Sequence, residues 1–99
     1  MPGEDKTSGS ALYVFTKEDC ANCPAAKLVV EEALMGTGFP MRVVDLAEVD
    51  EELDFRMLES QIFIASTPSI VLESQGSLTL LYSGEVPTVE QVRKSLGVT

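Results

Sequence analysis

The chain has 99 residues, of which 44% are hydrophobic, and this is enough for one small domain with a single core. Its formal net charge of −9, from 16 acidic and 7 basic residues, argues against nucleic acids and anionic membranes as partners, because like charges repel. Two cysteines and no long apolar segment argue against a disulfide-rich secreted scaffold and against a transmembrane helix.

The first ten residues are polar and include two glycines and two serines. They cannot bury enough apolar surface to become ordered, so we expect a flexible N-terminal tail over 1–10, followed by one domain over 11–99. They also lack the apolar core of a signal peptide. We therefore expect a reducing, cytoplasmic setting.

The predicted elements begin with the apolar run Ala11–Phe15, which is typical of a central strand covered on both faces. After a polar loop, a helix is predicted to begin near Cys20 or Ala21, since proline is tolerated in a first turn and Pro24 would lie there. Its apolar positions recur every three or four residues and form the stripe Cys23, Ala26, Val29, Val30, Ala33 and Leu34. Glycines at 36 and 38 end this helix.

The later elements are predicted in the same way. Apolar runs indicate strands, and apolar residues that recur every three or four positions indicate helices. We predict, in order, a strand at Met41–Asp45, a helix from Glu48 to near Ser60, strands at Ser69–Leu72 and Leu78–Tyr82, and a helix at Val89–Leu96. Thr88 and Gln91 match a capping box for the last helix, and Gly97 follows it.

The predicted order is β-α-β-α-β-β-α. Strands joined by a helical crossover are expected to be parallel, and the two strands joined by the turn at 73–77 antiparallel. The predicted fold class is therefore α/β, a three-layer sandwich in which helices cover both faces of a four-stranded mixed sheet.

Both cysteines lie in the sequence Cys20-Ala21-Asn22-Cys23, where the predicted first helix begins. Two thiols three residues apart can close a disulfide that reopens easily, and the positive end of a helix dipole stabilises a thiolate. We predict a redox-active Cys20–Cys23 disulfide, in which Cys20 is the nucleophile and the more shielded Cys23 is the resolving thiol.

Charges near the predicted nucleophile oppose one another. Lys17 would stabilise a thiolate at Cys20, whereas Glu18 and Asp19 would destabilise it, and the chain has no histidine. We expect a modest lowering of the thiol pKa, which favours a reductant over an oxidant.

Two further interpretations of the cysteine pair stay open at this point. Two thiolates can hold a soft ion, so a copper or zinc carrier is an alternative, although four-coordinate zinc would need ligands beyond these two and the chain has no other cysteine or histidine. The pair could also be a remnant in a non-catalytic interaction domain.

Several motifs together resemble one known family. They are Phe15–Lys27 with Val29–Glu32 after it, Ser66–Val71, and Ser83-Gly84. The combination of Cys-x-x-Cys with a later Thr-Pro before a strand is similar to thioredoxin-fold proteins, in particular to the small archaeal glutaredoxin-like thioredoxins. The resemblance spans about Leu12 to Leu96 and implies a thioredoxin-like fold that exchanges disulfides with no bound cofactor.

The resemblance also implies a substrate site. It implies that Pro68 is cis and lies against the dithiol, and that the backbone of Thr67, after Ser66, pairs with an extended substrate. Gly84 matches a glycine beside the substrate groove, and Lys17 a lysine near the thiolate. Ala21 and Asn22, between the cysteines, complete the predicted substrate-binding set.

The chain departs from the family patterns at several places. Ala21-Asn22 replaces the Pro-Tyr of glutaredoxins, and Ser83–Thr88 replaces the segment that holds the amine of glutathione. Val14 stands near the place of the buried aspartate of thioredoxins, which leaves the proton acceptor unassigned. The preferred interpretation is a disulfide reductase of client proteins, and a glutathione-dependent glutaredoxin is the alternative. We expect a monomer, recycled by a thioredoxin-reductase-like or glutathione-based system.

Overall fold

The computed structural model describes residues 10–97. The predicted tail lies outside these residues except for Ser10, which is the first residue of a strand. The elements are β1 (Ser10–Thr16), α1 (Cys23–Leu34), β2 (Met41–Asp45), the short 3-10 helix η2 (Leu46–Glu48), α2 (Glu51–Glu59), β3 (Ser69–Ser74), β4 (Ser77–Ser83) and α3 (Val89–Leu96). The predicted order of strands and α-helices is confirmed.

The four strands form one mixed sheet in the order β2-β1-β3-β4. β1 pairs with β2 in parallel and with β3 antiparallel, and β3 pairs with β4 antiparallel. All five residues of the predicted strand Ala11–Phe15 are buried, as expected for a central strand with both faces covered.

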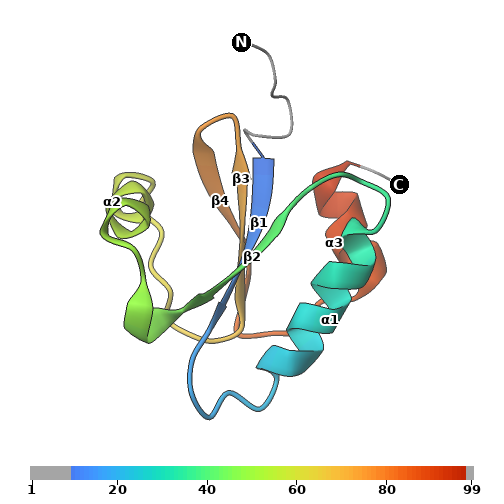
Figure 1. The fold of residues 1–99 in the computed structure, drawn as a ribbon, viewed down its shortest axis with the longest axis horizontal. Coiled ribbons are helices and arrows are strands. Elements are labelled where there is room, and N and C mark those ends of the chain that lie inside the picture. Colours follow the sequence, from blue (N-terminus) through green and yellow to red (C-terminus); the bar gives the residue numbers. More distant parts are fainter. Residues whose placement is uncertain (1–9, 98–99) are drawn as a thin grey trace.

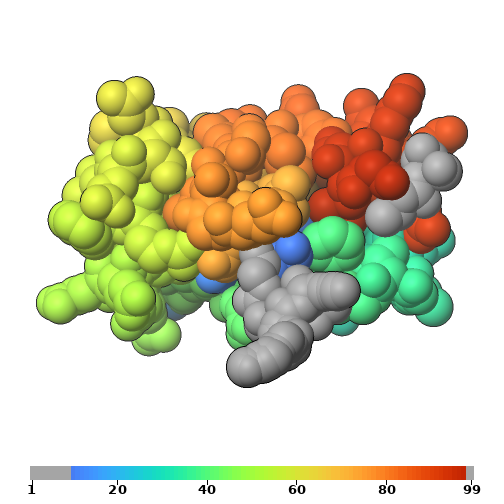
Figure 2. All heavy atoms as spheres, turned by 90° about the horizontal axis from the view of Figure 1, so that it is seen from above, coloured from blue at the N-terminus to red at the C-terminus, as the bar shows by residue number. Residues whose placement is uncertain are grey.

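Helices cover the two faces of the sheet and make three layers (Figure 1), which Figure 2 shows from above, with α2 on one side of the β3–β4 hairpin and α3 on the other. Alternate residues of β1 face the two layers. Ala11, Tyr13 and Phe15 pack with Leu53 and Met57 of α2, whereas Leu12 and Val14 pack with Val30 and Ala33 of α1 and Val92 of α3. None of the helices within residues 10–97 combines the length and apolar character needed to span a bilayer.

The direction of β3 corrects one expectation. The rule that a helical crossover joins parallel strands holds for β1 and β2, but β3 runs opposite to β1, its neighbour, and therefore to β2. After α2, the segment 60–68 returns along the sheet before β3 begins, so the chain reverses once more than a simple crossover would (Figure 1). As a result, β3 starts at the end of the sheet where β1 finishes.

The helix α2 begins later than predicted. The side chain of Asp45 accepts a hydrogen bond from the backbone N–H of Ala47 (2.9 Å), and this turns the chain into η2. Val49 follows η2 in an extended conformation and packs against the core. The helix α2 starts only at Glu51. Its end agrees with the prediction, because Ser60 is the C-cap.

The last helix fixes the position of α1. The predicted capping box is confirmed, with Thr88 and Gln91 exchanging hydrogen bonds, and Gly97 adopts the left-handed conformation at the C-terminus. The guanidinium of Arg93 donates to the backbone carbonyl of Ala33 (3.0 Å), one of the carbonyls that the end of α1 leaves without an intrahelical partner. The helix that carries Cys23 is thereby tied to α3.

Candidate functional site

The two cysteines form a disulfide, with the sulfur atoms 2.09 Å and the Cα atoms 5.5 Å apart. Cys23 is the first residue of α1 and is buried, with 4% of its surface exposed, whereas Cys20 lies in the turn before the helix and is half-buried. The helix thus begins three residues after Cys20, and the prediction that it starts at Cys20 or Ala21 is wrong.

Pro24 explains the late start of α1. In an α-helix the first hydrogen bond runs from an N–H to the carbonyl four residues earlier, and a helix capped by Cys20 would need the N–H that Pro24 lacks. With Asn22 as the N-cap, the first bond runs from Ala26 N–H to Asn22 O (3.1 Å). The N–H of Cys23 instead donates to Cys20 O (3.4 Å), and this turn brings the two sulfurs together.

The sulfur of Cys20 still lies at the N-terminus of α1, because it is bonded to a sulfur on the first helical residue. The unpaired N–H groups and the positive end of the helix dipole stabilise a negative charge at this position. The site can therefore hold a thiolate once the disulfide is reduced. Asp19, immediately before Cys20, has a φ of +63°, a left-handed conformation that few residues other than glycine adopt.

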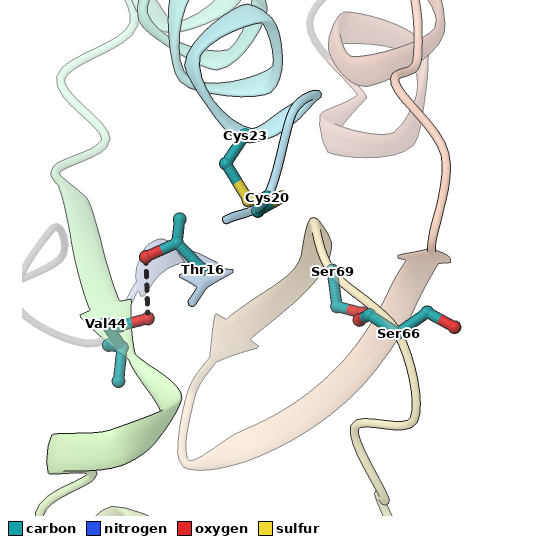
Figure 3. The surroundings of a disulfide bond; sticks show 6 residues. All are labelled: Thr16, Cys20, Cys23, Val44, Ser66 and Ser69. Carbon is teal, nitrogen blue, oxygen red and sulfur yellow. Dashed lines mark hydrogen bonds between the residues drawn. A yellow bond between two sulfur atoms is a disulfide. The ribbon is translucent and has the colours of Figure 1, made fainter. Parts of the chain in front are cut away.

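The loop at Ser66–Pro68 lies at the same end of the sheet. Phe15 pairs with Ser69, so the residues just before Ser69 are close to the end of β1 and to the loop that leads to Cys20 (Figure 3). The Thr67–Pro68 peptide bond is cis, the side chain of Pro68 is fully buried, and Ser66 is exposed. The hydroxyl of Ser69 donates to the carbonyl of Ser66 and closes the loop.

Gly84 holds this loop in place. Its N–H donates to the carbonyl of Pro68 (2.8 Å), and its φ of +78° lies in the region that favours glycine. A Cβ at this position would lie 2.8 Å from the Cβ of Ser66, closer than two such atoms can pack. The sequence placed Gly84 beside a substrate groove and did not indicate this contact, although a glycine shortly after a predicted strand is a signal for a special backbone position.

The other predicted site residues lie around the disulfide to differing degrees. Ala21 and Asn22 are exposed in the turn between the two cysteines. Lys17 is exposed in the loop after β1, and its side chain makes no ion pair or hydrogen bond within residues 10–97. It lines a groove with Asp45 and Glu48, on the side of the loop that faces η2.

The structure adds a partly buried polar cluster that the sequence did not indicate. The hydroxyl of Tyr13 donates to one carboxylate oxygen of Glu73 (2.9 Å), and Arg56 donates to the other (2.8 Å). Burial, and then the hydrogen bond to Glu73, raise the pKa of Tyr13. Tyr13 packs in the α2 layer, whereas α1 lies on the opposite face of β1, so this cluster does not supply the missing proton acceptor.

The soft-metal alternative gains no further ligands. Across residues 10–97, no three histidine, cysteine, aspartate or glutamate side chains are grouped so that they could hold a metal ion. Val14, near the place of the buried aspartate of thioredoxins, is fully buried. The chemically distinctive feature of this end of the sheet is the disulfide itself.

Comparison with known proteins identifies the fold. Residues 11–97 match a family described as a thioredoxin domain, and no curated protein matches the chain. A thioredoxin variant from Halobacterium salinarum NRC-1 is 18% identical, with a TM-score of 0.66 over 88% of this chain and 71% of the other. The oxidised thioredoxin of Plasmodium falciparum is 19% identical, with a TM-score of 0.62 over 89% and 81%.

A thioredoxin-like protein from Bacillus cereus is 13% identical, with a TM-score of 0.62 over 94% of this chain and 91% of the other. At these identities, the likeness to solved structures shows the fold alone. The family match, together with a cysteine pair that forms a disulfide at the start of α1, supports a thiol-disulfide oxidoreductase.

Proposed function

Because the chain belongs to the thioredoxin-domain family, we propose that it is a protein disulfide reductase. The observation that carries this proposal is the unequal exposure of its two bonded cysteines, with Cys20 half-buried before α1 and Cys23 buried within it. A disulfide with one accessible sulfur supports a directional exchange with another protein.

The reduced protein would act in two steps. The thiolate of Cys20 attacks one sulfur of a client disulfide, a Cys20–client bond forms, the client bond breaks, and the released client thiolate takes up a proton. The thiolate of Cys23 then attacks the sulfur of Cys20, which forms the Cys20–Cys23 disulfide and releases the second client thiolate. Two electrons pass from the dithiol to the client.

The loop Ser66–Pro68 is the proposed docking site for the client. Ser66 is exposed, Thr67 is half-buried, and both precede the buried strand β3. An extended client segment can hydrogen-bond to backbone groups at such a position. Pro68 has no N–H and its carbonyl is bonded to Gly84, so the backbone groups of Thr67 are the ones proposed to pair with the client. We propose that Gly84 acts by holding this loop in position.

The proposal includes a recycling step and a location. An external thioredoxin-reductase-like or glutathione-based system would return the disulfide to the dithiol, as a reducing cytoplasm allows. No bound cofactor takes part in either exchange, and the proposed acting form is a monomer.

Reduction of insulin by dithiothreitol, followed by turbidity, tests the proposal. We expect the wild type to accelerate precipitation, and both Cys20→Ser and Cys23→Ser to lose the acceleration. Ala25→Ser is the matched control, because it adds a hydroxyl at an exposed position of the same helix and removes no sulfur. Turnover of a small glutathione mixed disulfide, but not of insulin, would contradict the proposal and favour a glutaredoxin.

A further inference from the structure

A second surface feature lies beside α2, away from the disulfide. A groove of about 460 Å³ separates η2 and α2 from the segment that follows α2. Its apolar lining includes Leu46, Val49, Leu58, Phe63 and Ile64. Phe63 and Leu58 are 69% and 52% exposed, although both are large apolar side chains. We call this feature the α2 groove.

Acidic side chains line the same groove. Glu51 and Asp54 both contribute to its wall, and with Leu58 they stand at positions i, i+3 and i+7 of α2, which lie on one face of a helix. Among residues 10–97, no lysine or arginine lines the groove. Arg56, the basic residue of α2, points to Glu73 of the sheet. The groove therefore combines an apolar floor with uncompensated negative charge.

The α2 groove adjoins a second groove that reaches the loop before Cys20. This second groove, of about 410 Å³, is lined by Lys17, Glu18, Asp45, Ala47 and Glu48, and Ala47 lines both grooves. Lys17 and Glu18 belong to the loop that leads to Cys20. Three acidic residues outnumber Lys17 in the second groove, so acidic side chains are found from this loop to α2.

We propose that the α2 groove binds the client segment beside the disulfide under attack, and that it selects segments in which an apolar side chain is followed by lysine or arginine. This inference rests on the proposed function and specifies its substrate class. The apolar side chain would lie against Leu58 and Phe63, and the basic side chain would reach Glu51 or Asp54. An extended peptide advances about 3.3 Å per residue, so a few residues suffice to span neighbouring grooves.

Charge complementarity favours this occupant over others. A second copy of the chain carries the same charge of −9 and would be repelled, as would an acidic peptide. A neutral apolar peptide would fill the floor but would leave the carboxylates without partners. A segment with both an apolar and a basic side chain satisfies both parts of the groove.

A binding measurement tests the inference separately from redox activity. Two fluorescent peptides, identical except for two lysines or two glutamates after a leucine, carry serine in place of cysteine and are titrated with the oxidised protein. We expect the lysine peptide to bind at least about fivefold more tightly, the size expected for two exposed charge pairs. Equal Kd values would overturn the inference.

Variants then locate the binding site. Glu51→Gln with Asp54→Asn should reduce the preference for lysine several-fold. Glu31→Gln with Glu32→Gln, two exposed acids of α1 on the other face of the sheet, removes the same net charge and should preserve the preference. Phe63→Ser, an exposed position, should weaken binding of both peptides several-fold. A lysine preference that both pairs of charge variants reduce equally, or binding unchanged by Phe63→Ser, would overturn the inference.

Failure of the proposed function would give a different result. Reduction of 2-hydroxyethyl disulfide, which is small and uncharged, reports the dithiol chemistry alone. We expect the α2 variants to keep the wild-type rate with it and to lose about fivefold in rate with a lysine-flanked cystine peptide. A wild type inactive on both disulfides would sink the reductase proposal, while the peptide affinities would still decide the role of the groove.

Discussion

At the scale of single residues, Gly84 has no room for a side chain. Both its φ of +78° and its distance to Ser66 exclude a side chain, and its N–H is bonded to Pro68. We predict that Gly84→Ala lowers the free energy of unfolding by about 3–4 kcal/mol, the sum of a strained backbone and an overpacked contact. Urea denaturation measures it, and insulin reduction should fall with it.

Two variants separate the contact from the backbone strain. Gly76 has a φ of +85° with open space around it, so Gly76→Ala should lose only the backbone part, about 1–2 kcal/mol. Adding Ser66→Gly to Gly84→Ala removes the clashing Cβ and should restore part of the stability. Equal losses in Gly84→Ala and Gly76→Ala would show that the contact with Ser66 has no effect.

At the scale of elements, the cluster of Tyr13, Arg56 and Glu73 joins β1, β3 and α2. Its tyrosine has a pKa above the usual value of 10.0, chiefly because it is buried. As pH rises through about 10, the unfolded chain therefore loses this proton before the folded one does, and the folded state loses stability. The stabilisation is complete below pH 10 and declines as pH approaches the folded pKa.

This pH dependence is measurable by comparison with Tyr13→Phe, which cannot titrate. Free energies of unfolding from urea titrations between pH 8 and pH 11.5 should fall more steeply in the wild type than in the variant above pH 10. All other ionisable groups are common to the two proteins, so the difference between the curves isolates Tyr13. Parallel curves would contradict the raised pKa.

Elements also show where the sequence was sufficient for prediction and where it was not. The burial of Ala11–Phe15 and the caps of α3 depend on local patterns, so both could be predicted. The direction of β3 depends on the path of 60–68, which has no regular periodicity. The start of α1 depends on Pro24, which has no N–H to donate to the carbonyl of Cys20. The rule that proline is tolerated in a first turn does not by itself show which carbonyl is affected.

For the site, the local motif at Cys20 and Cys23 was predictable, because both residues belong to one turn. The contacts between Gly84 and Ser66 and between Tyr13 and Glu73 join residues 18 and 60 positions apart. No spacing rule in a single sequence connects such pairs. The α2 groove is of the same kind, since η2, α2 and the segment after α2 form it together.

At the scale of the whole molecule, the acidic surface bears on the redox balance. A net charge of −9, with Glu18 and Asp19 beside Cys20, opposes an unusually stable thiolate, and a stable thiolate is what makes a dithiol oxidising. We predict a reduction potential near that of thioredoxin, about −270 mV, measured by equilibration in dithiothreitol redox buffers. A potential near about −120 mV would show an oxidant.

The central claim is that Cys20 attacks the client and Cys23 resolves the intermediate. The most direct test mixes each single-cysteine variant, reduced, with a disulfide-containing client such as insulin, quenches with acid, and detects covalent adducts by mass spectrometry. The account predicts that Cys23→Ser, which keeps the more accessible Cys20, accumulates a mixed disulfide, and that Cys20→Ser does not. An adduct that forms only through Cys23, or in neither variant, would contradict it.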